Sequence, residues 1–500
     1  MEPSVSTVYG TITAAARTHA GAPAIVHEGR TTTYAELLGQ VDQAARQLRA
    51  NGVGYGDMFA VYAQNRPEIM VAYFAAAKIG AVMVPINPNM TASEVRHAVM
   101  HCEAKVLYHD DLVAEAAAEA MPAEKRRPIA SLLDACDVPD AGPDVRIAQD
   151  DDAVVVYTSG STGAPKAIVL SHRSQTNVLA SLTEMWGITD RDVLLVGLPL
   201  GYLYGLSTAS AAALKMGAKV VLMRRFHPGE ALDAFVKERA TVFQGVPTMF
   251  AMMLDYAEQR GLDIDLTHVR MLICAGAPLP EELKVRFAKR FRKEIRNYYA
   301  LSECTPVFGV YATDTDPPAG AAGRLAPGAS VRIIDGEGRD CPDGSAGELL
   351  VKGAALVKRY HKEPGLTAAA FADGWFKTGD VACRDGQGFY TITGRIKDII
   401  IRGGANIVPS EVESVLARHE AVQAVAVIGV PDRIFGEVPV AFVVPRAGAK
   451  PTPETLIAHA ESALADFKVP RTIRMLAELP LGQTGKVDKK ALLATWTASA

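Results

Sequence analysis

The segment 152–172 concentrates groups suited to binding phosphate. An apolar run at 153–157 leads into Thr-Ser-Gly-Ser-Thr-Gly-Ala-Pro-Lys at 158–166, and a second apolar run and a helix follow. Glycines let a backbone approach its ligand closely, and successive N–H groups of such a loop form an anion-binding nest. The hydroxyls and the amine of Lys166 add further donors. The pattern predicts a phosphate-binding loop, with a Ser/Gly-rich surface turn as the alternative.

This loop differs from the P-loop of nucleoside triphosphatases. Counted from Gly160, Lys166 stands where the P-loop lysine would. Pro165 takes the place of the second glycine, and Ala167 that of the Ser or Thr. A different phosphate-binding arrangement is therefore expected.

The elements that must hold the loop alternate between short apolar strands and amphipathic helices. Strands are predicted at 193–200, 218–223, 241–246 and 271–275, and helices at 228–240, 249–258 and 280–291. This repetition predicts an α/β fold with a parallel sheet covered by helices.

The pattern changes after Gly320 and again after Gly394. Asp-Gly and Glu-Gly turns separate the apolar segments that follow Gly320, and such turns favour hairpins in a β-rich region. The remainder predicts a small α+β unit, with helices at 410–417 and 452–465 and strands at 422–430 and 438–444.

Composition narrows the class of protein. The chain has 500 residues, with 52 Lys plus Arg against 56 Asp plus Glu, so nothing in its charge favours nucleic acid or an anionic membrane as partner. Its longest apolar stretch, 71–86, contains Lys78 and falls short of the ~18 residues of a membrane span. The six cysteines form no CxxC pair, which disfavours a zinc site. A cytoplasmic location is expected, because the cysteines are scattered and no basic leader opens the sequence.

Five further motifs follow the loop in order. They are Ala-Gly-Ala-Pro at 275–278, Tyr-Ala-Leu-Ser-Glu at 299–303, Thr-Gly-Asp at 378–380, Gly-Arg-Ile-Lys-Asp at 394–398 and Gly-Lys at 485–486. Together with the loop, they resemble the adenylate-forming superfamily, which comprises acyl-CoA synthetases, adenylation domains of peptide synthetases and luciferases. The resemblance runs from Thr-Tyr-Ala-Glu-Leu at 33–37 to Lys486 and so covers nearly the whole chain.

The resemblance implies two domains. A large N-terminal domain, residues 1–395, would contain helix-covered sheets and a β-rich part at about 320–393. A small mobile α+β domain, residues 396–500, would carry Lys486. In this family the small domain rotates between two half-reactions, and Lys397 matches the hinge position.

The resemblance also implies roles in binding ATP and Mg²⁺. Glu303 and Thr158 would hold Mg²⁺, and Lys486 would bridge the acid's carboxylate and the α-phosphate. The other implied contacts are Ser159, Gly160, Ser161, Thr162, Gly163 and Lys166 at the phosphates, Gly276, Ala277, Pro278 and Tyr299 at the adenine, Ser302 at the α-phosphate, and Asp380 and Arg395 at the ribose. Taken singly, the alternatives are a surface acid at Glu303, a turn residue at Asp380, and solvated cations at Arg395 and Lys486.

Coenzyme A is the expected acyl acceptor. A carboxylate would attack the α-phosphorus of ATP and release pyrophosphate, and a thiol would then expel AMP. A thiol of pKa near ~8.5 needs no dedicated base, so His172 is interpreted as structural. The pantetheine arm would pass Arg402, Gly403 and Gly404, although two adjacent glycines are also typical of a hairpin turn. A free-standing ligase that loads a carrier protein is the alternative.

The acid itself is expected to be compact. The acyl pocket implied by the resemblance is built by residues 198–206 and 244–248, Gly276 and Leu301, and Tyr202, Tyr204, Gly205 and Val246 lie within those ranges. Tyr202 stands where many relatives have His, and Ala300 replaces a usual Gly. The tyrosines favour a short, branched, cyclic, aromatic or hydroxylated acid. If their rings only pack against the sheet, a medium- or long-chain fatty acid remains the alternative.

The sequence thus predicts an AMP-forming acid–thiol ligase acting on a small carboxylic acid, with homodimer formation left open. No Asp occurs at 198–206, where amino-acid-activating relatives bind the ammonium group. A second hypothesis is an adenylate-binding sensor without turnover. The presence of Lys486, Glu303 and Asp380 disfavours it.

Overall fold

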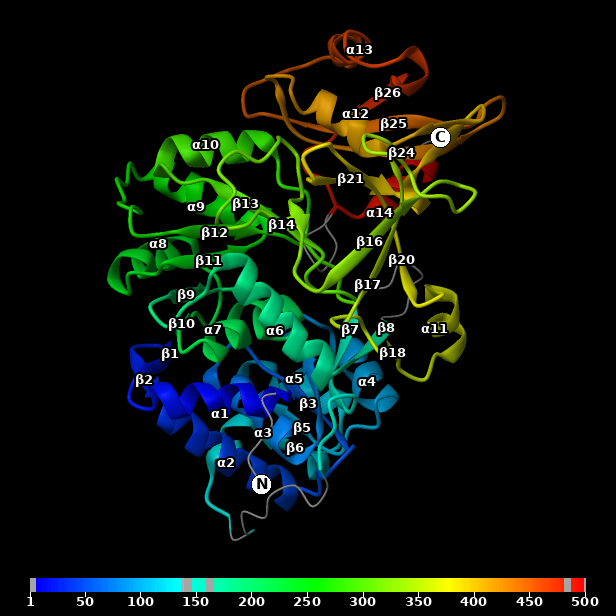
Figure 1. Cartoon of the computed structure of the whole chain (residues 1–500). Helices are drawn as coiled ribbons and strands as arrows, with labels where there is room; N and C mark the ends of the chain where they lie inside the picture. The colour runs from blue at the N-terminus through cyan, green and yellow to red at the C-terminus, as the bar shows by residue number, and fades with distance from the viewer. Residues whose placement is uncertain (1–5, 137, 139–145, 159–165, 481–486, 499–500) are drawn as a thin grey trace. The chain divides into compact units, whose positions relative to one another are not determined.

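The computed structural model describes the chain except for residues 1–5, 137, 139–145, 159–165, 481–486 and 499–500 (Figure 1). It divides into two compact units. The large unit comprises Met1–Ser330 and Val351–Phe376. The small unit comprises Val331–Leu350 and Lys377–Ala500.

A nine-stranded sheet runs through the large unit. Its order is β15-β14-β13-β12-β11-β9-β10-β1-β2, and the neighbours from β13 to β1 are parallel. The bounds are β1 (Pro23–His27), β2 (Arg30–Thr33), β9 (Val193–Val196), β10 (Lys219–Leu222), β11 (Val242–Gly245), β12 (Met271–Cys274), β13 (Ile295–Tyr299), β14 (Phe308–Gly309) and β15 (Arg324–Leu325). The α/β fold with a parallel sheet expected from the sequence is confirmed.

Helices cover both faces of this sheet, because successive side chains of a strand point to opposite faces. Phe243 and Leu272 pack with the cluster that holds α8 (Pro228–Lys237), α9 (Pro247–Gln259) and α10 (Glu281–Phe291). Their neighbours Val242 and Ile273 belong to the cluster of the other face. The helices of that cluster are α1 (Val8–His19), α2 (Tyr34–Ala50), α3 (Pro67–Ile79), α6 (His172–Trp186) and α7 (Ala212–Lys215).

A seven-stranded sheet, of order β18-β8-β7-β4-β3-β5-β6, completes the large unit's framework. Its strands are β3 (Met58–Tyr62), β4 (Val82–Ile86), β5 (Leu107–His109), β6 (Arg126–Pro128), β7 (Asp152–Thr158), β8 (Lys166–Ser171) and β18 (Arg359–Tyr360), with α4 (Ala92–His101) and α5 (Ala114–Ala120) packed on it. The sequence patterns did not predict β3 to β6. Helix α3 between β3 and β4 is buried from Ile69 to Ile79, so strand and helix there form one apolar run without a distinguishing period.

The segment after β9 also departs from the prediction. The strand ends at Val196 instead of residue 200, because the Asn65 side chain binds the chain beyond it. The Leu200 N–H donates to Asn65 Oδ1 at 2.8 Å, and Asn65 Nδ2 donates to the Leu198 carbonyl at 2.9 Å. A π-helix, η4 (Tyr204–Ala211), follows. Such helices are rare and often occur at functional sites.

The small unit holds most of the predicted β-rich region and the predicted α+β region. The β-rich sheet has the order β16-β17-β20-β19 with β21 on β20. Its strands are β16 (Ala329–Ile334), β17 (Gly347–Gly353), β20 (Trp375–Arg384), β21 (Tyr390–Arg395) and β19 (Phe371–Ala372), the last of which belongs to the large unit. A second sheet, of order β23-β22-β25-β24 with β26 on β25, contains β22 (Ile400–Arg402), β23 (Ala405–Ile407), β24 (Val422–Asp432), β25 (Gly436–Pro445) and β26 (Thr472–Met475). Its helices are α12 (Pro409–Leu416), α13 (Pro453–Glu461) and α14 (Lys489–Ala498).

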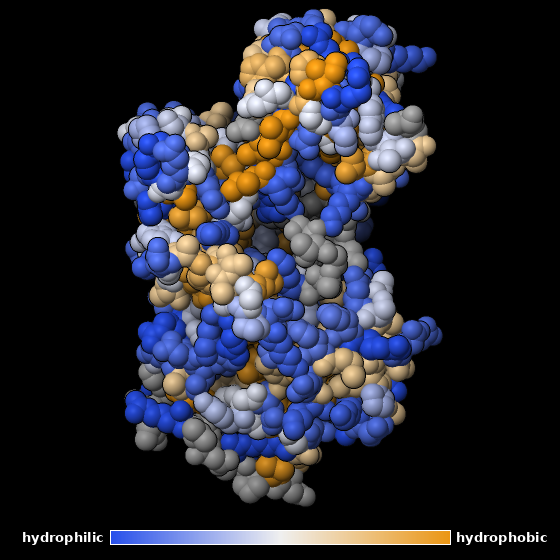
Figure 2. Space-filling model, turned by 90° about the vertical axis from the view of Figure 1, so that its right-hand side faces the viewer, coloured by the Kyte–Doolittle hydropathy of each residue, from blue (hydrophilic) through white to orange (hydrophobic). Residues whose placement is uncertain are grey.

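The surface is mostly polar on the face drawn in Figure 2, where hydrophobic residues form smaller patches among hydrophilic ones. Within the described residues, no helix combines the length and the apolar character needed to cross a membrane.

Candidate active site

The phosphate-loop sequence connects two paired strands. β7 and β8 are antiparallel, and Thr158 at the end of β7 faces Lys166 at the start of β8. The Thr158 hydroxyl donates to the Lys166 carbonyl at 3.4 Å. The pairing fixes both ends of the loop. The loop residues predicted to contact phosphate, Ser159, Gly160, Ser161, Thr162 and Gly163, lie outside the described residues.

A distant part of the chain joins this hairpin to the turn that carries Glu303. We call residues 356–361 the bridging segment. On one side, the N–H groups of Lys358 and His361 donate to carbonyls of β8, at 2.9 and 2.8 Å. On the other side, the Val357 N–H donates to the Glu303 carbonyl at 2.7 Å. The hairpin and the Glu303 turn are thereby held in one framework.

Tyr360 of the bridging segment contacts two of the predicted site residues. Its hydroxyl donates to Glu303 Oε1 at 3.0 Å, and the Lys166 ammonium lies 5.6 Å from the centre of its ring. Burial raises the pKa of Tyr360, and the adjacent Glu303 carboxylate raises it further, so the phenol stays protonated and remains a donor. Tyr360 thus connects the anion and the cation that would face the phosphates. The sequence motifs gave no signal for it.

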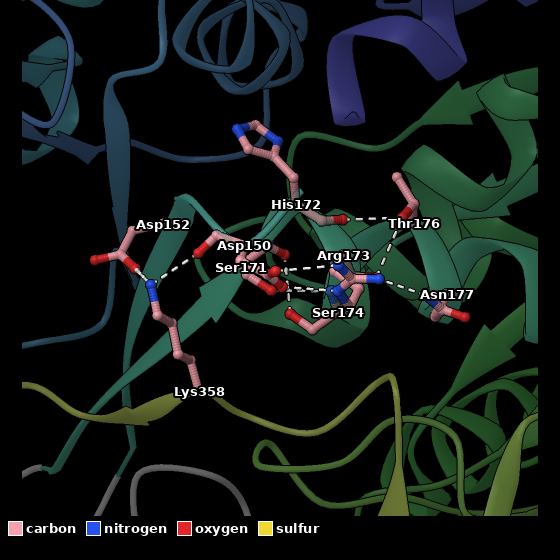
Figure 3. A network of polar contacts seen from close by, with 9 residues as sticks. All are labelled: Asp150, Asp152, Ser171, His172, Arg173, Ser174, Thr176, Asn177 and Lys358. Carbon is pink, nitrogen blue, oxygen red and sulfur yellow. Dashed lines mark hydrogen bonds and ion pairs between the residues drawn. The ribbon is translucent and has the colours of Figure 1, made fainter. Parts of the chain in front are cut away.

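A polar network holds the other ends of these strands (Figure 3). Asp152 at the start of β7 pairs with Arg359 and, at 3.0 Å, with the Lys358 ammonium. Burial alone would raise the pKa of Asp152, but the hydrogen bonds from the two cations outweigh it and lower the pKa. Arg173 in the first turn of α6 pairs with Asp150 at 2.7 Å. The network fixes the bridging segment to β7.

His172 is buried at the start of α6 and its ring points away from this network (Figure 3). Its Nδ1 accepts a hydrogen bond from the Val8 N–H at 3.4 Å. Burial lowers the pKa of His172 to about 4, so the ring is neutral at neutral pH. These contacts join α6 to α1.

The donor set around Glu303 fits Mg²⁺. Mg²⁺ is usually held by one or two carboxylates together with substrate phosphates and water, and does not need a cage of protein ligands. Only one Glu303 oxygen has a partner, the Tyr360 hydroxyl, in the described part of the chain. No group of three or more His, Cys, Asp or Glu there could hold a metal alone. The arrangement therefore suits a metal that arrives with a nucleotide.

The other motifs of the large unit meet at one edge of the nine-stranded sheet. β11, β12 and β13 are parallel and end at Gly245, Cys274 and Tyr299, so the residues after them lie at the same edge. These following residues include the predicted site residues Val246, Gly276, Ala277, Pro278, Leu301, Ser302 and Glu303.

Gly276 and Tyr299 show how closely this edge of the sheet is packed. Gly276 has φ +85°, and a Cβ on it would lie 3.2 Å from the Val246 side chain. The Tyr299 ring stacks on Phe308 with centres 5.7 Å apart. A rigid aromatic ring at the end of β13 suits a nucleobase, which gains from stacking.

The predicted acyl-pocket tyrosines differ in their contacts. The Tyr204 hydroxyl lies 3.2 Å from the Gly245 carbonyl to which it donates, so it stabilises the sheet edge. Tyr202 is half-buried, and burial raises the pKa of its hydroxyl. Gly205 lets the π-helix pack closely against the preceding loop, because a Cβ at this position would lie 2.4 Å from the Pro199 carbonyl oxygen.

A small cavity lies next to these residues. It is lined by Leu170, Gln175, Val178, Leu203, Ser207, Thr208, Ser302, Thr305 and Ala355. Ser302 is a predicted α-phosphate contact and Leu203 follows Tyr202, so the cavity joins the nucleotide and acyl parts of the prediction. Gln175, Ser207, Thr208 and Thr305 were not predicted from the sequence, because their place depends on α6 and the π-helix packing together.

The small unit brings together Asp380 and Arg395. The two face each other in β20 and β21, and Arg395 Nε lies 2.8 Å from Asp380 Oδ1. Asp380 lies inside a strand and is only 3% exposed, so it is not the turn residue of the alternative interpretation. Lys397 lies in η5 (Ile396–Asp398), where burial lowers its pKa.

The Arg402–Gly404 sequence forms a turn between β22 and β23. Gly403 and Gly404 have φ +56° and +86°, which favour glycine. The Arg402 guanidinium donates to the Phe467 carbonyl at 2.7 Å and lies 4.9 Å from the Phe435 ring centre. Both glycines are exposed. Lys486 lies outside the described residues.

Comparisons with known proteins agree with this geometry. The family described as AMP-binding enzyme matches residues 12–361, and the AMP-binding enzyme C-terminal domain matches residues 411–486. Feruloyl-CoA synthase of an Amycolatopsis species is 37% identical over 477 residues, 95% of this chain and 96% of that protein. Indoleacetate–CoA ligase of Aromatoleum aromaticum is 33% identical, and the match covers 94% of each chain.

A solved structure shares the fold over nearly the whole length. ATP-bound MatB from Rhodopseudomonas palustris superposes with a TM-score of 0.91 at 29% identity, covering 98% of this chain and 99% of that chain. The sequence matches, the shared fold and the motif order agree with one another. The chain therefore belongs to the family of AMP-binding, adenylate-forming enzymes.

Proposed function

We propose that this chain joins a compact carboxylic acid to coenzyme A at the expense of ATP, through an acyl-adenylate, with release of pyrophosphate and then AMP. The observation that carries the proposal is the contact of Lys166, Tyr360 and Glu303 beside the phosphate loop. It places a cation and a carboxylate in one fixed frame next to that loop. The family membership and the two CoA-ligase relatives support the reaction class.

In the first half-reaction, the large unit would align ATP with the acid. Lys166 and Thr158 would hold the β- and γ-phosphates together with the loop, Tyr299 would lie against the adenine, and Ser302 would reach the α-phosphate. Glu303 and Thr158 would hold Mg²⁺, which supplies neutralisation of phosphate charge when it is bound. Lys486 would bind the acid's carboxylate and the α-phosphate. Alignment and charge stabilisation would account for most of the acceleration.

In the second half-reaction, residues of the small unit would serve the thiol. The thiol attacks the acyl carbon, AMP leaves, and the thiol proton passes to solvent. We assign Asp380 and Arg395 to the ribose, Lys397 to the hinge, and the exposed Gly403 and Gly404 to the path of the pantetheine arm. The proposed functional domains are residues 1–395 and 396–500, and a cytoplasmic location would supply ATP and coenzyme A.

The acid is proposed to be compact because large side chains fill the acyl region. The ring centres of Tyr204 and Tyr298 lie 6.1 Å apart, and Tyr298 belongs to the core cluster against which Tyr204 packs. Ferulate and indoleacetate, the acids named for the two relatives, are aromatic acids of this size class, which supports the proposal.

The direct test is pyrophosphate release and AMP formation over a panel of carboxylic acids, with and without coenzyme A. We expect turnover on compact acids, with acyl-CoA and AMP formed only when coenzyme A is present. Pyrophosphate release without a thioester would identify a carrier protein as the acceptor instead. Nucleotide binding without any pyrophosphate release would contradict the ligase and favour a sensor.

The proposed role of Lys486 has a separate test. Lys486→Ala should reduce adenylation by about 10²-fold or more, because it removes a cation from the developing charge. Thioester formation from supplied acyl-adenylate should change much less. Lys490→Ala, at an exposed neighbouring lysine, is the matched control. Equal losses in both half-reactions of Lys486→Ala would contradict the assigned role.

A further inference from the structure

We propose that the acyl pocket recognises a hydroxyl group on the acid, through the Tyr298 hydroxyl and the side-chain carbonyl of Gln244. The inference rests on the proposed function and specifies its substrate class as hydroxylated carboxylic acids.

The Tyr298 hydroxyl is buried and has no hydrogen-bond partner within the described residues. Tyr298 is 5% exposed and lies in β13 directly before Tyr299, with its ring 5.1 Å from that of Trp186. Burial raises its pKa, so the phenol is neutral and keeps its proton. The hydroxyls of Thr208 and Thr305 lower the pKa of Tyr298 against the larger effect of burial, although neither forms a hydrogen bond of normal geometry with it.

Gln244 presents the complementary group. It is 2% exposed and lies in β11, and its Nε2 donates to the Thr208 carbonyl at 3.3 Å. This bond fixes the amide so that Oε1 is the remaining acceptor. Oε1 has no partner in the described part of the chain. Thr208 therefore lies next to both unpartnered groups.

Both groups lie next to Thr208, which lines the small cavity that Ser302 also lines. Thr208 and Thr305, the neighbours of Tyr298, both line that cavity. Ser302 is the proposed contact of the α-phosphate, so an acid bound for adenylation would extend from the same place. A buried polar group without a partner destabilises the fold, and a ligand that supplies the partner removes this cost when it binds.

The chemistry of the two groups selects the ligand. Gln244 Oε1 can only accept a hydrogen bond, and the Tyr298 hydroxyl can donate one. A substrate hydroxyl does both at once, donating to Gln244 and accepting from Tyr298. Two other polar side chains nearby are already engaged. Tyr204 donates to Gly245, and Gln175 Oε1 accepts from Tyr73 and Ser207.

The test compares acids that differ by one hydroxyl. Thioester formation would be measured with benzoate against 3- and 4-hydroxybenzoate, and with cinnamate against 4-hydroxycinnamate. We expect wild type to favour at least one hydroxylated acid by about tenfold or more in kcat/KM. Tyr298→Phe and Gln244→Leu should each bring that ratio close to one, through loss on the hydroxylated acid. Tyr62→Phe, whose hydroxyl bonds the Met90 carbonyl outside the pocket, should keep it.

Three results would overturn the proposal. A wild-type ratio near one for every pair, which needs no variant to fold, would indicate that a buried water satisfies the two groups. An unchanged ratio in both Tyr298→Phe and Gln244→Leu would show that other residues discriminate. In these two cases thioester would still form, so the proposed function would stand. Absence of thioester and pyrophosphate with every acid would instead overturn the proposed function together with the inference.

Discussion

On the phosphate side of the large unit two carboxylates are held by hydrogen-bond donors, whereas on the acyl side two buried polar groups lack a partner among the described residues. On the phosphate side, Glu303 is bound by Tyr360, and Asp152 is bound by two cations of the bridging segment. On the acyl side, Gln244 Oε1 and the Tyr298 hydroxyl have no partner among the described residues. Both sides flank Ser302, which lines the cavity between them.

This difference corresponds to what each side must recognise. ATP is the same substrate in every member of such a family, so protein groups that are fixed in place before ATP binds can stabilise its phosphates without reorganisation. The acid differs between members. Unpartnered groups in a packed pocket select a substrate because an acid lacking the matching group leaves them unpaired. The phosphate side is therefore preorganised, and the acyl side is completed by its ligand.

The largest effect is expected at the charge of Glu303. Glu303→Gln keeps an acceptor for the Tyr360 hydroxyl but removes the negative charge that would hold Mg²⁺. Adenylation, measured as pyrophosphate release, should fall about 10²-fold or more, and by the same factor for every acid. Glu281→Gln, at an exposed helix position paired with Lys284, is the control. A loss that depended on the acid would break the division between the two sides.

A smaller effect, on the free energy of unfolding, is expected from the titration of His172, which joins α6 to α1. Burial lowers its folded-state pKa to about 4, below the ~6.5 of an unfolded histidine. The unfolded chain therefore binds the proton first as pH falls. The free energy of unfolding that this group contributes is complete above pH ~6.5 and decreases by about 2 kcal/mol at pH ~5.

The measurement is denaturant unfolding between pH 7 and pH 5. The decrease in the free energy of unfolding between pH 7 and pH 5 should be smaller in His172→Gln than in wild type. His419→Gln, at a histidine of the small unit, should keep the wild-type decrease. Identical pH profiles for wild type and His172→Gln would contradict the assignment.

The smallest of these effects is expected at Tyr360. Tyr360→Phe removes the hydroxyl that holds Glu303 and keeps the ring beside Lys166. Binding of Mg·ATP, measured by calorimetry, should weaken about three- to tenfold because one hydrogen bond to a charged group is lost. Tyr311→Phe, whose hydroxyl donates to the Leu325 carbonyl at 2.7 Å, tests whether loss of any hydrogen-bonded phenol has this effect. Equal weakening in both variants would remove the special role of Tyr360.

The alternation of short apolar strands and amphipathic helices was enough to predict the α/β fold class, and the motif residues were predicted from their resemblance to the adenylate-forming superfamily. The structure adds that the motifs at 275–278 and 299–303 follow parallel strands and therefore lie at one edge of the sheet. The roles of those residues remain predictions, and Lys486 and most of the phosphate loop lie outside the described residues.

Sequence reasoning did not find Tyr360 or Tyr298, although it placed Gln244 in the acyl pocket. Tyr360 is 57 positions from Glu303, and the two are brought together by the pairing of β18 with β8 and by the hydrogen bond from the Val357 N–H to the Glu303 carbonyl. Tyr298 and Gln244 lie in different strands, and each interacts with Thr208 of a π-helix that no periodicity of the sequence predicted. Such contacts depend on tertiary packing, and a single sequence does not record them.

The most direct test of the contrast is a comparison of Tyr298→Phe with Tyr360→Phe in two assays, discrimination between hydroxylated and parent acids and affinity for Mg·ATP. Each variant removes one buried hydroxyl and keeps its ring. The account predicts that Tyr298→Phe loses discrimination and retains Mg·ATP affinity, and that Tyr360→Phe does the reverse. Loss of both properties in either variant would contradict the division into a preorganised phosphate side and a ligand-completed acyl side.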